Sequence, residues 1–196
     1  QTWDGYDAFA QTKMARKLIK KFSSKNQPFL LMLSWGPPHE PYHAAPEEFK
    51  DLYKGVDIKI PENVPEEHQG KARNQLRGYY SHISALDQCL KMIMKCLKRN
   101  VLEDNTLVVM TSDHGDMLGE HGLWRKMSFY DQSVRVPLQI LGPQFDTGKI
   151  DKPVSNLDIF PTILDAANID LDQYEFDGQS YNSTSEFMEA IQDAKK

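Results

Sequence analysis

The sequence is poor in cysteine. Its 196 residues hold two, Cys89 and Cys96, both in a stretch that is predicted to be one helix. Seven positions along a helix separate the two Cα atoms by roughly 10 Å, which is too far for a disulfide between them. We therefore expect two buried thiols, which say little about the redox compartment.

Basic charge is also scarce. Lysine and arginine together number 23 against 28 aspartates and glutamates, so the formal net charge is -5. No basic stripe is available to neutralise phosphates, and we expect no nucleic-acid partner. The single basic cluster has the spacing of a solvated helix face and comprises Lys13, Arg16, Lys17, Lys20 and Lys21.

Long apolar runs are absent too. None approaches the roughly 18 residues that a membrane-spanning helix needs, so no membrane span is expected in this chain. The composition is otherwise that of an ordinary globular protein, with 26% charged and 40% hydrophobic residues. The length suits one domain that buries a core of its own.

Apolar periodicity predicts alternating helices and short buried strands. Helices are expected over 7–24, 46–53, 71–99 and 158–167, and strands over 28–35, 106–111 and 136–141. This order is typical of an α/β fold, with a mainly parallel sheet flanked by helices. In such sheets ligands bind at the carboxyl ends of the strands, so the residues that follow 28–35 and 106–111 are the first candidates for function.

Asp113 and His114 follow the second of these strands directly. A carboxylate and an imidazole on consecutive residues can ligate a divalent cation, and Gly115 lets the backbone turn sharply or approach a ligand closely. Two ligands do not complete a coordination shell, so the others must come from elsewhere. The competing interpretation is an aspartate that caps a turn beside an exposed histidine.

The loop after this pair is rich in polar and charged side chains. Lys126 can bind one oxygen of an oxyanion and offset charge on a leaving group, and Arg125 precedes it directly. His121, between two glycines, can contact substrate or orient a ligand. Trp124 is interpreted as a packing anchor of the loop rather than a stacking platform.

A second candidate, His39, lies in a proline-rich loop after the first strand. Flanking prolines stiffen the backbone and reduce the entropy lost when a side chain is positioned. An imidazole beside a bound anion is suited to protonating a departing alkoxide. A hydrogen-bonded loop histidine with no such role is the alternative.

Three segments together resemble the sulfatase family of the alkaline-phosphatase-like superfamily. The run "TSDHGDMLGEHGLWRKMSFYDQSVRVPLQILGP" is similar to the metal segment of the family and the lysine-bearing stretch after it. "PPHEPYHAAPEEF" resembles the family's histidine loop, and "SNLDIFPTILDAANI" its helix after a core strand. The resemblance implies a partial sulfatase-like α/β catalytic core over 1–169 and a polar tail, 170–196, that leads toward a further subdomain.

The resemblance also implies roles for single residues. Asp113 and His114 would ligate a divalent metal, usually calcium, and Lys126 would bind the sulfate ester. His39 would contact the sulfate or its bridging oxygen and help the alcohol leave. His121 and Arg125 are expected to contact the substrate, a sulfate ester that is expected to be carried on a carbohydrate.

One family feature is missing. Sulfatases use a formylglycine nucleophile made from a Cys/Ser-x-Pro-x-Arg motif, and this motif occurs nowhere in the 196 residues. The acidic metal ligands that the family supplies from its first strand are missing too, and both belong N-terminal to the part present. We therefore expect this chain to be a fragment that is inactive by itself. The resemblance further implies a periplasmic, extracellular or lysosomal location.

Three functions compete for the protein of which this sequence is part. The first is a metal-dependent sulfuric ester hydrolase. The second is a phosphonate monoester or phosphodiester hydrolase of the same superfamily, which shares the Asp-His metal pair. The third is a non-catalytic binding or structural domain derived from a sulfatase, although such a domain has no evident need for Asp113, His114, His39 and Lys126 together.

Overall fold

The computed structural model describes residues 5–25, 27–149, 154–178 and 180. The chain forms two compact units. The first takes the chain up to Glu103 and also contains Gly115–Val134, and the second contains Asp104–His114 and the chain from Arg135 onward. The predicted boundary between 169 and 170 stays a prediction, and most of the tail beyond it lies outside the described residues.

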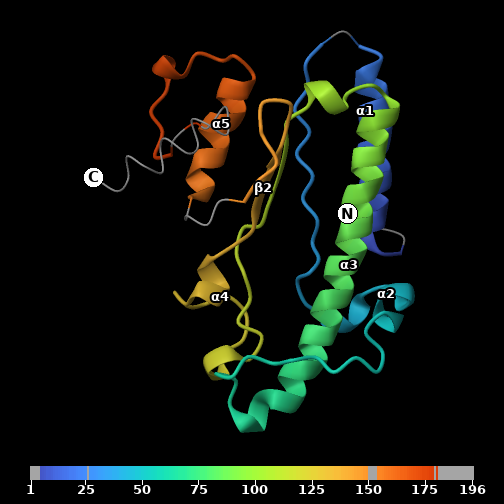
Figure 1. Cartoon of the computed structure of the whole chain (residues 1–196), viewed down its shortest axis with the longest axis vertical. Coiled ribbons are helices and arrows are strands. Elements are labelled where there is room, and N and C mark those ends of the chain that lie inside the picture. The colour runs from blue at the N-terminus through green and yellow to red at the C-terminus, as the bar shows by residue number, and fades with distance from the viewer. Residues whose placement is uncertain (1–4, 26, 150–153, 179, 181–196) are drawn as a thin grey trace. The chain divides into compact units, whose positions relative to one another are not determined.

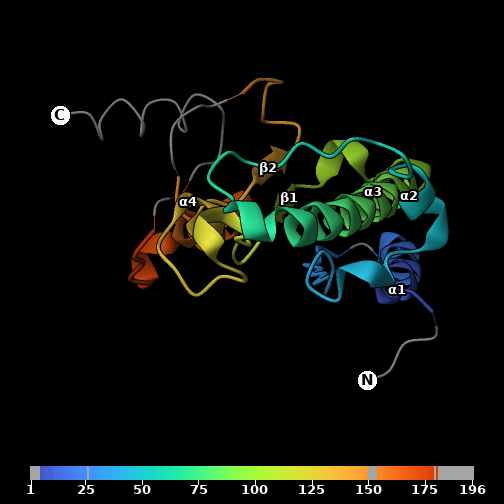
Figure 2. The same cartoon turned by 90° about the horizontal axis from the view of Figure 1, so that it is seen from below.

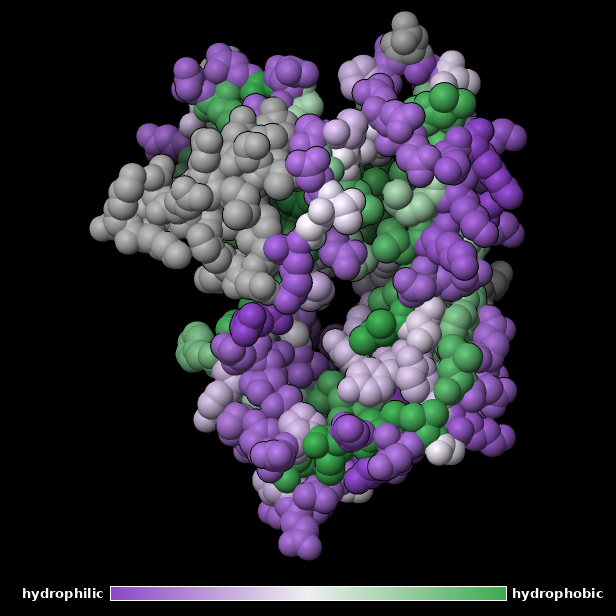
Figure 3. All heavy atoms as spheres, viewed as in Figure 1, coloured by the Kyte–Doolittle hydropathy of each residue, from purple (hydrophilic) through white to green (hydrophobic). Residues whose placement is uncertain are grey.

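Two long helices dominate the first unit (Figure 1). Helix α1, Asp7–Ser23, packs along α3, Gln69–Arg99, and both confirm the predicted helices. The buried residues of α1 recur at intervals of three and four, as expected for one apolar face against a neighbouring helix: Ala8, Thr12, Ala15 and Ile19. Hydrophilic side chains predominate along the outer edge of the helix pair (Figure 3).

Not every large apolar residue along α3 is buried. Leu76 and Leu97 are buried, but Ile83 is 43% exposed. Small residues such as Ala85 and Cys89 occupy the buried positions instead, because small side chains let two helices approach closely. Both cysteines are free and buried, as predicted.

The remaining elements of the first unit are short. They are α2, Glu47–Asp51, α4, Asp131–Val134, and three single-turn 3₁₀ helices, Tyr42–Ala44, Glu66–His68 and Glu120–Gly122. Figure 2 shows α1, α2 and α3 from below, with α3 running across the view. A small apolar core lies where these turns meet α3, built from Tyr42, Ile58, Leu76 and Leu118.

The predicted strand at 28–35 is extended, but it pairs with no strand in the described part of the chain. Its side chains alternate in burial, with Leu30 and Met32 exposed by 75% and 88%. The expectation that it is buried on both faces is therefore wrong for the described residues. The half-buried face includes Trp35, whose indole N–H donates to Thr12 Oγ1 of α1 at 3.1 Å.

The second unit holds the sheet. Strand β1, Val108–Thr111, pairs with β2, Leu138–Leu141, and Val108 lies opposite Leu141. The pairing is antiparallel, which corrects the expected parallel arrangement for these two strands. Parallel neighbours need a crossover, usually a helix, whereas the chain between β1 and β2 contains only short turns and the four-residue α4.

Helix α5, Ile159–Ala166, completes the second unit with the 3₁₀ turns Asn156–Asp158 and Leu171–Gln173. A capping box starts this helical region: Ser155 Oγ accepts from the backbone of Leu157, and Asp158 accepts from the backbone of Ser155. The predicted helix over 158–167 is confirmed. Within the part of the chain that the structure describes, no helix is long and apolar enough to cross a membrane.

Candidate active site

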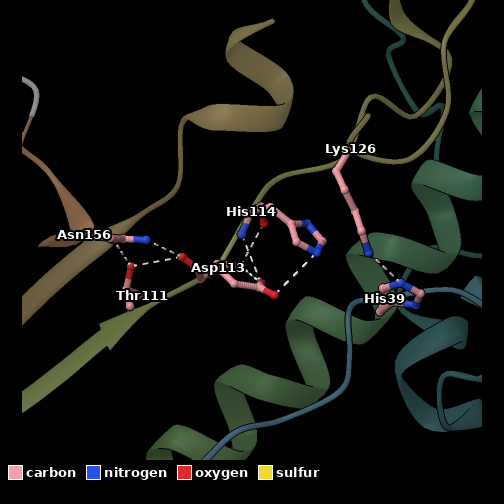
Figure 4. Close-up of polar contacts among 7 residues, drawn as sticks. His39, Thr111, Asp113, His114, Lys126 and Asn156 are labelled. Atoms are coloured by element: carbon pink, nitrogen blue, oxygen red, sulfur yellow. Dashed lines mark hydrogen bonds and ion pairs between the residues drawn. The ribbon is translucent and has the colours of Figure 1, made fainter. Parts of the chain in front are cut away.

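Asp113 and His114 lie at the carboxyl end of β1, in the second unit. Asp113 Oδ1 accepts hydrogen bonds from the backbone N–H of His114 at 3.0 Å and from Ser112 Oγ at 3.3 Å. The other carboxylate oxygen, Oδ2, lies 3.4 Å from His114 Nε2, as Figure 4 shows. The two side chains that were predicted to share a metal therefore converge, and the Asp113 side chain is 83% exposed.

The electrostatics keep Asp113 ionised. Burial by itself would raise the pKa of this carboxyl, but the adjacent His114 ring and the backbone N–H of His114 outweigh that effect. The pKa of Asp113 consequently lies below its usual value. The carboxylate is thus present as an anion at neutral pH, the form that binds a hard cation.

Asn156, which precedes α5 in the same unit, holds the end of β1. Its amide Nδ2 donates to the Ser112 carbonyl at 2.9 Å, and its Oδ1 accepts from Thr111 Oγ1 at 3.0 Å (Figure 4). One side chain therefore holds the two residues that precede Asp113. No motif pointed to this role, because an asparagine just before a helix is ordinary in that position.

The donors at this strand end are of the kinds that bind a divalent metal. Asp113 offers an oxygen that faces His114 Nε2, and this combination of carboxylate and imidazole suits a divalent cation. Among the described residues no group of three or more histidine, cysteine, aspartate or glutamate side chains is arranged to hold a metal. The pair offers two donors, and its role as a metal site stays a prediction.

His39 and Lys126 meet in the first unit, although 87 residues separate them in the chain. Lys126 Nζ lies 3.2 Å from His39 Nε2 (Figure 4). His39 Nδ1 lies 3.0 Å from the Glu40 carbonyl oxygen. An ammonium can only donate, so Nε2 accepts and Nδ1 carries the proton that is donated to the carbonyl. The two loops therefore place a cation and a neutral imidazole side by side.

Arg125 and His121 are each engaged by neighbours. Arg125 pairs with Glu40 at 3.1 Å, next to the His39 contact, and its side chain is 68% exposed. The ring of His121 stacks on Tyr130 with centroids 4.2 Å apart, and its Nε2 accepts from Asn63 Nδ2 at 3.1 Å. Arg125 is thus beside the His39–Lys126 pair, whereas His121 is bound into contacts with its own loop and with Asn63.

Trp124 packs within the loop, as interpreted. Lys71 of α3 lies over its ring at 3.7 Å from the centroid, and the His68 ring meets it edge to face at 6.0 Å. The backbone of Gly119 passes against the same ring, and a Cβ on Gly119 would lie 3.1 Å from a ring carbon of Trp124. The tryptophan therefore anchors the loop to the start of α3.

Sequence reasoning gave no role to Asp116. Its carboxylate accepts from the Tyr42 hydroxyl at 2.5 Å, from the Leu118 backbone N–H at 3.1 Å and from the Arg125 backbone N–H at 3.2 Å. These donors engage both carboxylate oxygens. Only the folded chain brings Tyr42 to it.

Similarity to known proteins agrees with this geometry. The family described as Sulfatase matches residues 3–169. The chain is 33% identical over 172 residues to the ulvan-active sulfatase of Formosa agariphila, covering 85% of this chain and 34% of that protein. It is 34% identical over 194 residues to the choline-sulfatase of Rhizobium meliloti, covering 87% of this chain and 38% of that protein.

A solved structure shows the same fold. The crystal structure of the putative sulfatase yidJ from Bacteroides fragilis superposes with a TM-score of 0.75 at 34% identity, over 85% of this chain and 39% of that one. The α/β class and the alkaline-phosphatase-like core are thereby confirmed. The chain spans little more than a third of the length of these relatives. By the family match and the shared fold, it belongs to the sulfatase family.

Proposed function

We propose that the protein to which this chain contributes is a metal-dependent sulfuric ester hydrolase. The observation that carries the proposal is the 3.2 Å contact between Lys126 Nζ and His39 Nε2, which joins a cation and a proton-transfer group from two distant loops. A purely structural domain would gain little from such a pair, since a cation beside a neutral imidazole at an exposed position stabilises a fold only weakly.

Lys126 is the proposed anion-binding residue. Its ammonium can donate to one oxygen of the sulfate group and offset the negative charge that develops during ester cleavage. His39 is the proposed proton donor to the departing alcohol. When an anion takes over the Lys126 hydrogen bond, Nε2 of His39 is free to take up a proton from solvent, and the resulting imidazolium can donate that proton to the bridging oxygen as the alcohol leaves.

Sulfatases generally use a metal and a formylglycine. We propose that Asp113 and His114 provide two of the metal ligands and that the metal is Ca²⁺, in keeping with the oxygen-rich donor preference of that ion. The metal would stabilise negative charge on the bound sulfate and on the nucleophile. Formylglycine supplies that nucleophile, and its precursor motif is not among the 196 residues, so we infer that this chain alone is inactive.

A sulfated carbohydrate is the proposed substrate. Ulvan, named for the Formosa agariphila relative, supports this class, whereas choline in the Rhizobium meliloti relative shows that substrates differ within the family. Arg125, exposed beside Lys126, is proposed to contact the substrate outside the sulfate group. His121 is a weaker candidate for the same task, because Tyr130 and Asn63 occupy its ring.

The test compares Lys126→Ala with Lys13→Ala, an exposed lysine on α1, in the whole protein. We expect Lys126→Ala to lower kcat/KM on an aryl sulfate by roughly 10²- to 10³-fold, the usual effect of removing one charge-stabilising donor, and Lys13→Ala to have no effect. Equal activity of the two variants would contradict the role of Lys126.

Paired kinetics on an aryl sulfate and an aryl phosphonate monoester separate the competing functions. A strong preference for the phosphonate would replace the sulfatase proposal with the phosphonate hydrolase alternative. Absence of turnover on either ester, in protein shown to contain formylglycine and calcium, would favour the non-catalytic domain.

A further inference from the structure

The carboxylate of Asp116 joins two backbone positions of the loop that carries Lys126. Its Oδ1 accepts from the N–H groups of Leu118 and Arg125, at 3.1 and 3.2 Å. Both residues have left-handed backbone angles, with φ of +45° and +70°. Non-glycine residues rarely adopt these angles unless the surroundings enforce them. Asp116 therefore bonds to two of the three non-glycine positions of this loop that have such angles, the third being His121 with φ of +54°.

The second of these positions decides where Lys126 lies. Arg125 immediately precedes Lys126, so its backbone angles set the direction in which the chain presents the lysine. Its carbonyl also accepts from the backbone N–H of Met117, at 2.7 Å. The Met117 side chain is fully buried, which fixes this end of the loop to the core.

The other carboxylate oxygen of Asp116 reaches the loop that carries His39. It accepts from the hydroxyl of Tyr42, at 2.5 Å, and Tyr42 follows His39 by three residues. Hydrogen bonds to a charged acceptor are shorter and stronger than neutral ones. Burial, and then the bond to Asp116, raise the pKa of Tyr42 well above its usual value, so the phenol remains a donor.

Tyr42 is itself immobilised by α3. It is 7% exposed, and its ring belongs to the apolar core with Leu76 and Ile58. Its backbone passes so close to Gly78 of α3 that a Cβ on Gly78 would lie 2.8 Å from the carbonyl carbon of Tyr42. The hydroxyl therefore presents a fixed point to Asp116.

We propose that Tyr42 and Asp116 are positioning residues. They hold the loop that carries His39 and the loop that carries Lys126 in the relative position, or register, that brings His39 Nε2 and Lys126 Nζ together. That this register serves anion binding rests on the proposed function. The exposed Lys126–His39 contact is too weak to align two loops unaided, because the lysine stem is flexible and both polar ends are solvated. The Tyr42–Asp116 bond lies on the buried side and supplies the alignment.

The test uses Tyr42→Phe in the whole protein, with Tyr53→Phe as the matched control. Tyr53 also packs against this core, and its hydroxyl bonds to Ser84 of α3 at 2.8 Å, so the control loses a comparable buried hydroxyl away from both loops. The readouts are the ¹⁵N chemical shifts of the His39 ring, which report its tautomer, and the affinity for inorganic sulfate in an NMR titration.

In the unsubstituted chain and in Tyr53→Phe we expect His39 to carry its proton on Nδ1. In Tyr42→Phe both tautomers of His39 should be populated, with the proton on Nδ1 in some molecules and on Nε2 in others. Sulfate affinity should fall roughly tenfold, which corresponds to the free energy of one such hydrogen bond. Asp116→Asn, which keeps an acceptor for the backbone N–H groups but loses the carboxylate oxygen facing Tyr42, should give the same changes and serves if Tyr42→Phe folds poorly.

An unchanged His39 tautomer in Tyr42→Phe and Asp116→Asn overturns the proposal. Equal changes in Tyr53→Phe overturn it as well, since they would reflect general loosening of the core. If the unsubstituted chain binds no sulfate but Tyr42→Phe still alters the His39 tautomer, the positioning role stands and the anion-binding role of the proposed function fails.

Discussion

Gly78→Ala perturbs the helix that supports the candidate site. In an exposed helix, replacing glycine by alanine stabilises by about 1 kcal/mol, because alanine loses less backbone entropy. At Gly78 the new Cβ would meet the backbone of Tyr42, lying 2.8 Å from both its carbonyl carbon and its Cβ. Backbone atoms cannot rotate away as a flexible side chain can, so the Tyr42 segment and α3 must separate.

The expected magnitude follows from these two opposing effects. Overpacking in a well-packed core costs about 3 kcal/mol at the upper end of its usual range, which is appropriate for a backbone contact. After the gain in helix propensity, the net loss is about 2 kcal/mol in the free energy of unfolding. The matched control is Gly70→Ala in the same helix, where a Cβ meets nothing within 4 Å.

Urea unfolding followed by circular dichroism at 222 nm measures both variants, since α1 and α3 dominate the helical signal. We expect Gly70→Ala to be at least as stable as the unsubstituted chain and Gly78→Ala to unfold at a lower urea concentration with an unchanged slope. If Gly78→Ala proved as stable as Gly70→Ala, the close approach of Tyr42 to α3 would be refuted.

Two further predictions concern single ionisable side chains. His82 is 2% exposed, its Nδ1 lies 2.8 Å from the Tyr6 hydroxyl, and burial lowers its pKa. The unfolded chain therefore takes up more protons than the folded chain below about pH 6.5. The free energy of unfolding should consequently fall from about pH 7.5 to about pH 5.5. Urea unfolding at both pH values should show a smaller pH effect for His82→Asn, and an NMR titration that placed the pKa of His82 at or above that of a free histidine would contradict the reasoning. Asp113→Ala should abolish metal-dependent turnover of the whole protein while leaving the melting temperature unchanged, because the side chain is 83% exposed. Asp104→Ala is its control, and full activity of Asp113→Ala would remove Asp113 from the metal site.

The helices could be predicted because their signals are local. Apolar spacing indicated α1, α3 and α5 to within a few residues, and the basic cluster of α1 is exposed apart from the half-buried Arg16. The predicted strand at 28–35 pairs with no strand among the described residues, but the other two predicted strands were located nearly as well, at 108–111 and 138–141. Their direction was not, because pairing depends on the path of the connecting chain, which hydrophobic patterns do not encode.

The candidate site divides in the same way. The residue types and motif spacing identified four candidate functional residues, Asp113, His114, Lys126 and His39. Each remains a candidate for metal or substrate binding in the folded chain. The sequence by itself determined this chemistry, because carboxylate, imidazole and ammonium groups act through their own functional atoms wherever the chain carries them.

Only the tertiary structure decided how these groups are held. The 3.2 Å contact of Lys126 with His39 spans 87 residues, and the bond from Tyr42 to Asp116 spans 74. No local pattern specifies such pairings, since they arise when packing against α3 brings separate loops together. No role was assigned to Asp116 from the sequence, and it becomes a support for the Lys126 loop in the fold, because its three donors are assembled only there.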